Sequence, residues 1–526
     1  MVDPPPAAST TSPVPRPAGG IVYLIGAGPG APGLLTLRGA QLLHRSDVVL
    51  YDGLSNHDLL RHAPGAEHIC VGKHGQQRIW KQTEIIQEII RHAQAGKRVA
   101  RLKGGDPAVF ARTAEEVDAL KAASIPFEIV PGITAALAAG SYAGIPVTHR
   151  KFASAVALIT GHEEPEKTES ALDWDALAKF PGTLVIYMGV TTAKSWTDAL
   201  MQAGKPPETP ASLIRRCSLG DQQTLHCRLD EVADRLTPAS QFRPPVITIL
   251  GPVTQLAESM DWWSQRPLSG QTILVTRPSE QADALAIPLE EQGANVLRQP
   301  LIQIQPLDDF SSLDATIANL SDWDLVVFCS HNGVQHFLDR MLALETDLRR
   351  LGTTLLAAVG AKTADSLRQR GLIADIMPDD FHAAGLAEAV RSIVPQGKRA
   401  LIVRASRGKD DLANSLKSAG YPCDQVAAYL HADVTSTSPA VQKAMQQGEV
   451  DWVTVTSSAT ADNLHRLFGE HLDSVKIASI SEITSERIEQ LGYTVDAEAE
   501  PHTIEALVEA IVDSPLGDPK PFHSGE

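Results

Sequence analysis

The sequence has few cysteines, few aromatic residues and no long apolar run. Its five cysteines are scattered without a Cys-x-x-Cys pair, which argues against a zinc ribbon and a disulfide framework and leaves no predicted metal site. No uncharged apolar run approaches the roughly 18 residues of a membrane span, and the N-terminus lacks the apolar core of a signal peptide. We therefore expect a cytoplasmic protein with no part in a membrane.

Positive charge is also scarce. The chain has 46 Lys and Arg residues against 63 Asp and Glu residues, a net charge of −17. A surface of this sign repels nucleic acids and anionic membranes, so neither is an expected partner. A polyanionic substrate would have to be met by local clusters of Arg and Lys.

The length and composition predict several soluble α/β domains. A chain of 526 residues exceeds one hydrophobic core, and about 150 residues per domain predicts three or four. Residues 1–19, rich in Pro, Ala, Ser and Thr, form a predicted disordered tail. Residues 264–270 form a predicted linker, and residues 515–526 a second tail.

Residues 101–107 read Arg-Leu-Lys-Gly-Gly-Asp-Pro and lie between an apolar strand and a helical run predicted over 108–123. Two adjacent glycines remove every Cβ where a ligand would approach, so that backbone N–H and C=O groups can make the contacts. Arg101 and Lys103 add positive charge, which favours a cofactor on the glycines and an anionic substrate beside them. A tight turn with solvated basic neighbours explains the same residues.

Residues 21–52 follow the order of a dinucleotide-binding unit. A strand over 21–25 leads into Gly26-Ala-Gly-Pro-Gly-Ala31, a helix predicted over 34–43, a strand over 48–51 and then Asp52. Pro29 and Pro32, however, fix φ and remove N–H donors where a pyrophosphate would need them. A nicotinamide enzyme is therefore a weaker alternative, and Asp52 can also be a helix cap or a surface acid.

Eight collinear motifs make residues 20–263 resemble the uroporphyrinogen-III C-methyltransferases of the tetrapyrrole methyltransferase family. The motifs lie at residues 24–30, 51–52, 72–73, 101–107, 130–136, 142–150, 160–162 and 187–189. The resemblance implies a two-lobed α/β fold, S-adenosyl-L-methionine as the cofactor, and methylation of uroporphyrinogen III at carbons 2 and 7 to precorrin-2. It also implies a homodimer formed through this half.

By this resemblance, the cofactor contacts the glycine loops and a few residues of the second lobe. The predicted cofactor-binding residues are Pro29, Gly104, Gly105, Asp106, Val109, Thr134, Ala135, Met188 and Cys217. Cys217 stands where the family has a glycine, and we expect its main chain to make the contact.

The resemblance assigns the acid and base positions to Asp52 and Lys73. An electron-rich pyrrole carbon attacks the sulfonium methyl, and the enzyme must align the two groups and manage one proton per methylation. Lys73 can act by its charge or by proton transfer, and both alternatives stay open. The substrate carries many carboxylates, so the site needs cations; the candidates are Arg101, Lys103, Arg112 and Arg150.

From residue 271 the pattern changes to short apolar strands that run into Ser- or Thr-containing loops and are followed by helices. Six strands are predicted, at 272–275, 325–328, 355–359, 401–403, 452–455 and 477–480. They predict parallel sheets with hydroxyl-rich loops at the carboxyl ends of the strands. The second and third strands resemble the fifth and sixth, as two similar lobes would. The hydroxyls suit a bound polyacid, although Ser and Thr there can simply cap helices.

Residues 271–514 resemble the uroporphyrinogen-III synthases. The likeness is carried by Val275-Thr-Arg-Pro278, Ser330-x-Asn-Gly-Val334, Ala358-Val-Gly360 with Thr363, Tyr429 and Pro501-x-Thr-Ile-Glu-Ala-Leu507. It implies two lobes, lobe one from about 271–306 and 433–514 and lobe two from about 307–432. It also implies closure of hydroxymethylbilane to uroporphyrinogen III with inversion of ring D.

The implied cyclisation begins with loss of water, after which an azafulvene cation forms readily. The enzyme then has to fold the linear chain for attack at the substituted position and exclude simple closure. Tyr429 is the candidate that helps the hydroxyl leave. The candidate binding groups are Thr276, Ser330, Ser457 and Thr484.

Together the two resemblances predict a bifunctional enzyme on the way to siroheme or cobalamin, with the second half supplying the substrate of the first. One alternative is a methyltransferase for a different tetrapyrrole. Another is a second half that is an inactive, regulatory sensor. Ser481 and Ile483 favour this last alternative, because the synthases often have Gly-Pro-Thr-Thr where this chain has Ser481-Glu-Ile-Thr484.

Overall fold

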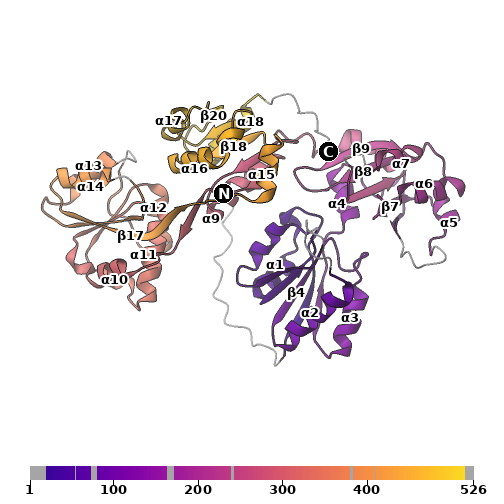
Figure 1. Ribbon diagram of the computed structural model, residues 1–526, viewed down its shortest axis with the longest axis horizontal. Helices are drawn as coiled ribbons and strands as arrows, with labels where there is room; N and C mark the ends of the chain where they lie inside the picture. The colour runs from indigo at the N-terminus through magenta and orange to yellow at the C-terminus, as the bar shows by residue number, and fades with distance from the viewer. Residues whose placement is uncertain are drawn as a thin grey trace. The chain divides into compact units, whose positions relative to one another are not determined.

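The computed structural model describes residues 19–53, 55–72, 80–162, 171–237, 242–378, 383–408 and 410–515. The chain divides into two compact units (Figure 1). Unit 1 comprises Met1–Gln271, Gln292–Asn295 and Leu516–Glu526, and unit 2 comprises Thr272–Glu291 and Val296–Pro515. Within the described ranges, no helix combines the length and the apolar character needed to cross a membrane.

The first sheet of unit 1 is parallel, in the order β3-β2-β4-β1-β5. Its strands are β1 (Ile21–Gly26), β2 (Val48–Tyr51), β3 (Glu67–Cys70), β4 (Arg98–Lys103) and β5 (Phe127–Val130). Helix α1 (Leu37–Arg45) packs on one face, and α2 (Gln82–Gln94) and α3 (Thr113–Ala122) pack on the other (Figure 1). Because both faces are covered, the strands are rich in Val, Leu and Ile throughout.

Two helices of this first sheet begin later than the sequence predicts. Helix α1 begins at Leu37 rather than at residue 34, because Pro32–Leu34 forms a 3-10 turn and Thr36 caps α1 by accepting from the Gly39 N–H. Helix α3 begins at Thr113 rather than at residue 108. Phe110 and Arg112 have φ values of 51° and 53°, in the left-handed region that a helix does not contain.

The second sheet of unit 1 is mixed, in the order β6-β7-β10-β8-β9. Its strands are β6 (Val156–Thr160), β7 (Thr183–Tyr187), β8 (Pro210–Arg215), β9 (Gln223–Arg228) and β10 (Val246–Leu250). Helix α4 (Ala135–Tyr142) packs small side chains on one face, and α6 (Ala193–Gln202) packs Trp196 and Leu200 on the other. Three shorter helices complete this part: α5 (Trp174–Ala178), α7 (Val232–Arg235) and α8 (Ala257–Met260).

Lobe one of unit 2 is built on the sheet β12-β11-β18-β19-β20. Strands β11, β18, β19 and β20 are mutually parallel. The strands are β11 (Thr272–Val275), β12 (Asn295–Arg298), β18 (Trp452–Val455), β19 (Lys476–Ser479) and β20 (Ala497–Glu498). The helices are α9 (Ser279–Glu291), α15 (Pro439–Gln446), α16 (Ser458–Phe468), α17 (Glu482–Gln490) and α18 (Ile504–Asp513).

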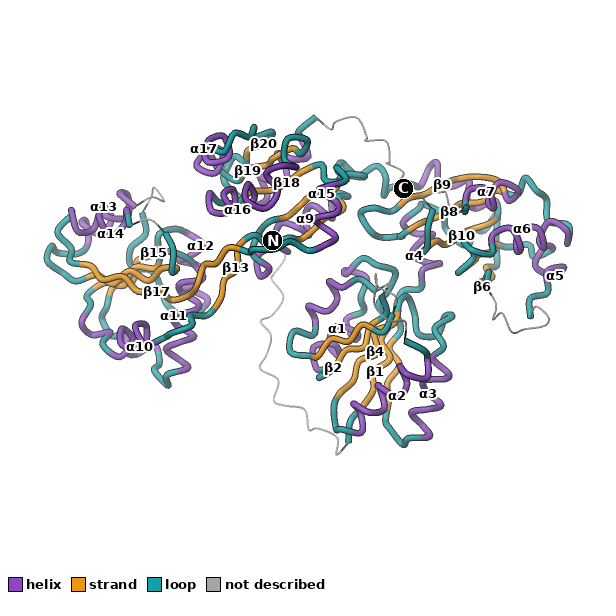
Figure 2. Tube along the Cα trace, viewed as in Figure 1, coloured by secondary structure: helices purple, strands orange, loops and turns teal. Residues whose placement is uncertain are grey.

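Lobe two is built on the sheet β13-β17-β16-β14-β15, which is parallel except for β13 (Figure 2). The strands are β13 (Ile302–Gln305), β14 (Leu325–Phe328), β15 (Leu355–Ala358), β16 (Ala400–Ala405) and β17 (Cys423–Asp433). The helices are α10 (Ser311–Ala318), α11 (His331–Ala343), α12 (Ala361–Gln369), α13 (Ala383–Ile393) and α14 (Asp411–Ser418). The parallel sheets predicted from the strand-loop-helix pattern are confirmed.

The two lobes of unit 2 repeat one hydrogen-bonding arrangement. In lobe two, the Asp375 carboxylate accepts from the Leu356 N–H of β15 at 2.8 Å. In lobe one, the Asp496 carboxylate accepts from the Ile477 N–H of β19, also at 2.8 Å. The separation along the chain is 19 residues in both cases. The internal repeat predicted from the strand pattern is therefore present in the backbone.

Candidate active sites

Three chain segments of unit 1 cross at backbone contact distance, at Gly26, Gly105 and Gly132. A Cβ on Gly132 would lie 2.2 Å from the Gly105 carbonyl oxygen, and a Cβ on Gly26 would lie 2.5 Å from Gly132 Cα. Gly28 and Gly105 exchange two backbone hydrogen bonds, of 3.1 and 2.8 Å. A side chain does not fit at Gly26 or Gly132, so the loops after β1, β4 and β5 have one fixed arrangement.

The loop at Gly104 and Gly105 presents its backbone to solvent. Gly104 is exposed, and among the described residues a Cβ placed on it would meet no atom within 4 Å. Asp106 ties the loop to its neighbours, because one carboxylate oxygen accepts from the Gly132 N–H at 3.0 Å and the other from the Ala108 N–H at 2.6 Å. The side chain of Asp106 thus holds the loop, and the backbone of Gly104 is open to a ligand.

A pocket of about 430 Å³ lies in unit 1, within the size range of small-molecule sites. Four residues predicted to bind the cofactor line it: Pro29, Ala135, Met188 and Cys217. Gly104, Gly105, Asp106, Val109 and Thr134 are not among its lining residues; the first four lie in the loop that Gly105 bridges to Gly28. Several other lining residues, among them His162, Tyr187, Arg216 and Val246, were not predicted as site residues from the sequence.

Tyr187 joins the two lobes of unit 1 at this pocket. Its Oη lies 2.6 Å from Thr134 Oγ1 and accepts from the Ala136 N–H at 2.9 Å. Its ring lies 5.1 Å from the ring of Phe110, which is partly exposed. Burial raises the pKa of Tyr187, so the phenol is neutral at physiological pH. The motif at residues 187–189 was the sequence feature that pointed to this position.

Cys217 lies buried in the same pocket wall. Burial raises the pKa of its thiol to about 12, so the thiol is neutral and a poor nucleophile or metal ligand. Across the described ranges, no group of three or more His, Cys, Asp or Glu side chains could hold a metal ion. A contact from the Cys217 main chain to the cofactor stays a prediction.

Beside the glycine loop, four charged side chains form one network. Lys103 Nζ donates to Glu116 Oε2 at 2.6 Å, and Arg101 Nε lies 3.4 Å from Glu116 Oε1. Arg101 also pairs with Asp52, whose other oxygen accepts from the Gly104 N–H at 3.4 Å. Arg101, Lys103 and Glu116 are 3%, 2% and 1% exposed, whereas Asp52 is partly exposed. Only Asp52 of the four therefore faces the open side of the loop.

The predicted substrate cations are in different surroundings. Arg101 and Lys103 lie within β4, and their charges are already met by Glu116 and Asp52. Burial lowers the pKa of Lys103, with the Arg101 charge acting in the same direction.

Arg112 is exposed and forms an ion pair with Glu115 at 2.7 Å. Arg150 is exposed, and among the described residues no acidic side chain lies within ion-pair distance of it. Lys73, the other predicted catalytic residue, lies outside the described residues. The contacts of Lys103 favour an internal structural role, and Arg150 has the most freely available charge.

The predicted hydroxyl groups of unit 2 lie at the carboxyl ends of its strands and are already hydrogen-bonded. Ser330 caps α11 by accepting from the Gly333 N–H at 3.0 Å, and Ser457 caps α16 by accepting from the Thr460 N–H at 3.2 Å. Thr276 and Thr484 are buried, with Thr276 donating to the Thr454 carbonyl and Thr484 3.2 Å from Ser481 Oγ. Helix capping is thus one role of Ser330 and Ser457, and substrate binding by all four residues stays a prediction.

Tyr429, which lies within β17, meets Ser330 where the neighbouring strand β16 ends. Its Oη lies 3.0 Å from Ser330 Oγ, and its ring stacks on that of His336 at 5.4 Å. Burial raises the pKa of Tyr429, so its phenol keeps its proton at neutral pH and can donate it. The pairing of β16 with β17 shifts register between Arg404 and Ala405, and this irregularity places Tyr429 opposite Ala405.

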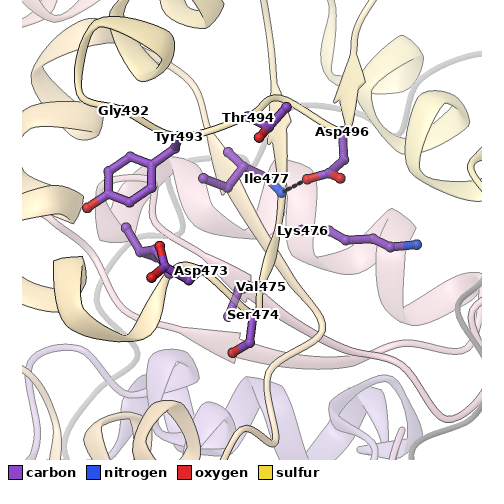
Figure 3. A pocket seen from close by; sticks show the side chains of 10 residues that line it. Asp473, Ser474, Val475, Lys476, Ile477, Gly492, Tyr493, Thr494 and Asp496 are labelled. Carbon is purple, nitrogen blue, oxygen red and sulfur yellow. Dashed lines mark hydrogen bonds between the residues drawn. The ribbon is translucent and has the colours of Figure 1, made fainter.

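A pocket of about 310 Å³ lies at the amino end of β19, whereas the predicted hydroxyl groups lie at the carboxyl ends of the strands. Figure 3 shows the side chains that line this pocket. In this pocket the Asp496 carboxylate accepts a hydrogen bond from the Ile477 N–H, and Lys476 donates to the Pro515 carbonyl at 2.6 Å. Because these polar groups already serve the fold, and the carboxyl ends of parallel strands are where ligands bind, we assign no chemistry to this pocket.

Comparison with known proteins gives matches to both halves of the chain. Residues 21–233 match the Tetrapyrrole (Corrin/Porphyrin) Methylases, and residues 283–509 match the family Uroporphyrinogen-III synthase HemD. The chain is 34% identical over 498 residues to the porphyrin biosynthesis protein HemD of Ruminiclostridium josui, covering 94% of this chain and 98% of that protein.

Two further relatives match smaller shares of this chain. The chain is 38% identical over 362 residues to the uroporphyrinogen-III C-methyltransferase of Bacillus subtilis, covering 68% of this chain and 74% of that protein. It is 47% identical over 238 residues to the S-adenosyl-L-methionine-dependent uroporphyrinogen III methyltransferase of Methanosarcina barkeri, covering 45% of this chain and 93% of that protein.

We predict that Gly132→Ala destabilises unit 1 by more than about 2 kcal/mol, because the new Cβ overlaps backbone atoms that cannot move aside. Urea denaturation followed by circular dichroism measures the loss. Gly33→Ala is the matched control: Gly33 is exposed with no described atom near its Cβ position, so the change should be below about 1 kcal/mol. Equal stabilities for the two variants would refute a tight crossing.

We also predict that Glu116→Gln lowers the free energy of unfolding by about 3 kcal/mol at pH 7, because it leaves two buried cations with one partner. The control is Glu115→Gln, at an exposed ion pair on the same helix, which should change stability by less than about 0.5 kcal/mol.

The deficit of Glu116→Gln should depend on pH. Glu116 raises the pKa of Lys103 against the lowering effect of burial, so its removal lowers that pKa further in the folded state. The unfolded chain then holds the Lys103 proton more tightly than the folded chain, and stability rises with pH up to about 10.4. Denaturation at pH 9.5 should show a smaller deficit than at pH 7, and a constant deficit would contradict the network.

Proposed function

The chain belongs to the tetrapyrrole methylases through residues 21–233 and to the uroporphyrinogen-III synthases through residues 283–509, and we propose that it makes uroporphyrinogen III and then methylates it. The methyltransferase half corresponds to residues 20–263 and the synthase half to residues 271–514. The product of the second half is the substrate of the first. Fusion of the two raises the local concentration of an oxidation-prone intermediate near its next enzyme.

The observation that carries the methyltransferase role is the pocket beside the glycine loop. Four residues predicted from the sequence to bind the cofactor line one cavity. The exposed backbone of Gly104 lies in the loop that is joined to Gly28, next to Pro29. The pocket fits S-adenosyl-L-methionine, since Met188 and Val246 supply apolar surface and Gly104 supplies free backbone groups. The cofactor would supply an electrophilic methyl group on sulfur.

The chain's own residues would orient the pyrrole and manage its proton. Asp52 is partly exposed and is oriented by Arg101, so its Oδ2, near the Gly104 N–H, is placed to accept the proton that a methylated carbon releases. Arg150 and Arg112 would bind substrate carboxylates at the surface of the site. Lys73 keeps its proposed part in acid-base chemistry. We assign the methylations to carbons 2 and 7 and the product to precorrin-2.

For the second half we propose closure of hydroxymethylbilane with inversion of ring D. The neutral phenol of Tyr429, paired with Ser330, would donate a proton to the departing hydroxyl. Thr276, Ser457 and Thr484 lie at neighbouring strand ends and would bind the folded substrate with the backbone amides around them.

Two further points belong to this proposal. We propose a homodimer formed through the methyltransferase half. A regulatory, inactive second half remains the alternative, and Ile483 favours it because this side chain is 71% exposed at the position where the synthases often have a polar residue.

The decisive experiment supplies the purified full chain with hydroxymethylbilane and S-adenosyl-L-methionine labelled with carbon-13 in its methyl group, without oxygen. We expect isomer III carrying labelled methyl groups at carbons 2 and 7 by NMR. Without the cofactor, uroporphyrinogen III should accumulate. Isomer I from hydroxymethylbilane, together with no labelling of added uroporphyrinogen III, would overturn both activities. Isomer I from hydroxymethylbilane together with methylation of added uroporphyrinogen III would support the regulatory alternative.

We predict that Tyr429→Phe lowers kcat for cyclisation on the order of 100-fold, because the departing hydroxyl loses its proton donor. The matched control is Tyr421→Phe, since Tyr421 is a buried tyrosine of the same lobe whose hydroxyl donates to the Val394 carbonyl at 2.6 Å. That variant should lose stability and keep kcat. Full activity of Tyr429→Phe would mean that the enzyme works by conformation alone.

A further inference from the structure

Three basic side chains of unit 2, one from lobe one and two from lobe two, lie close enough to interact electrostatically. Arg277 follows β11 of lobe one, whereas His331 begins α11 and Lys362 lies in the first turn of α12, both in lobe two. Gln281 connects the lobes: it accepts from Arg277 Nη2 at 3.0 Å, and its Nε2 lies 3.4 Å from His331 Nε2. We call Arg277, His331 and Lys362 the basic cluster.

The basic cluster lacks the acidic counter-charge that Arg101 and Lys103 have in unit 1. In the part of the chain that the structure describes, no acidic side chain lies within ion-pair distance of any of the three. Arg277 is 6% exposed, and its Nε has no hydrogen-bond partner among the residues that the structure describes. A buried guanidinium without an acid is costly to the fold, although the chain has 63 acidic residues against 46 basic ones.

The pKa values of these groups are lowered, as expected for positive charges that are desolvated and have no acidic partner. Burial lowers the pKa of Arg277, and partial desolvation together with the Arg277 charge lowers the pKa of Lys362. Burial, then Lys362 and Arg277, lower the pKa of His331 to about 4. A neutral His331 is consistent with its contact to Gln281, because an amide NH₂ donates and the ring nitrogen must then accept.

We propose that the basic cluster is a carboxylate subsite of the cyclising half and binds one acidic side chain of its polycarboxylate substrate; this inference rests on the synthase function proposed above. A guanidinium offers two parallel donors that match a carboxylate, and Lys362 adds a mobile charge. The first-turn N–H groups of α11 and α12 favour an anion at the same place.

The position of the basic cluster links binding to the predicted chemistry. His331 directly follows Ser330, whose Oγ lies 3.0 Å from Tyr429 Oη. A carboxylate held by Arg277 and Lys362 therefore anchors the substrate next to that hydroxyl pair. Because Arg277 comes from lobe one and the other two from lobe two, one bound carboxylate contacts both lobes.

The first test uses Arg277→Met and Lys362→Met in the full chain with hydroxymethylbilane as the substrate. Each variant should raise KM at least about 10-fold, the effect of losing one charge-assisted hydrogen bond, and keep kcat within about twofold. Lys398→Met is the control, because Lys398 pairs with Asp324 at 2.8 Å on the surface of lobe two, and its KM should not change.

Stability separates this function from a structural role. Arg277→Met replaces a buried, unpaired charge by an apolar chain of similar length, so its melting temperature should equal or exceed that of the natural chain. A structural role predicts a lower melting temperature. A lower melting temperature with an unchanged KM would overturn the proposal.

The second test follows the His331 ring by NMR while uroporphyrin III, the stable oxidised product, is added. A bound carboxylate offsets the neighbouring cations, so the His331 pKa should rise from about 4, saturably. The rise should be lost in the double variant Arg277→Met, Lys362→Met. A saturable rise of the His331 pKa with inorganic phosphate, and no rise with uroporphyrin III, would assign a phosphate site instead and overturn the inference.

The two proposals fail separately. If the natural chain makes no isomer III but His331 responds to uroporphyrin III, the synthase function is wrong and the subsite stands. If the natural chain makes isomer III while the variants keep their KM and His331 does not respond, the subsite is wrong and the synthase function stands.

Discussion

The contact of three backbones at Gly26, Gly105 and Gly132 is the constraint on which the first site depends. Because no Cβ fits at Gly26 or Gly132, the loops after β1, β4 and β5 pack against each other through their backbones. The carboxylate of Asp106 then fixes the loop from the side. A ligand meets backbone groups that are already in place, so little conformational entropy is lost on binding.

One group of buried or half-buried basic side chains in each unit can be compared by its acidic partners. In unit 1, Glu116 neutralises Lys103 and supports Arg101, so the network has as many negative as positive groups and one carboxylate, that of Asp52, reaches the open side. In unit 2, Arg277 and Lys362 have no acid in the described structure to neutralise them. The first arrangement orients a carboxylate, and the second leaves positive charge for a ligand.

The sequence predicted features that depend on neighbouring residues along the chain and missed those that depend on helix register. Strand ends, glycine loops and the repeat in unit 2 follow from local patterns. The choice of Pro29, Ala135, Met188 and Cys217, which line one pocket, came instead from the resemblance to the methyltransferase family. The burial of Lys103 could not be predicted, because the predicted helix began at residue 108.

Glu116, the partner of Lys103, lies on the inner face of a helix that begins at Thr113. The left-handed residues before this helix have no characteristic sequence pattern, so the start of the helix could not be predicted. The basic cluster was missed for a related reason. Arg277, His331 and Lys362 come from three loops far apart in the chain, and only the packing of two lobes joins them. Even Arg277, which stood in a recognised motif, gave no sign of its unpaired Nε.

Strand β17 couples the relative rotation of the two lobes of unit 2 to the position of Tyr429. It pairs in parallel with β16 and, by its last four residues, antiparallel with β13, before the chain crosses to lobe one at Val434. Tyr429 lies between the register shift and this crossing. Because these four residues adjoin Tyr429, rotation of one lobe against the other would bend or twist the strand next to the phenol. Hinge motion would then reorient the side chain that we propose as the proton donor.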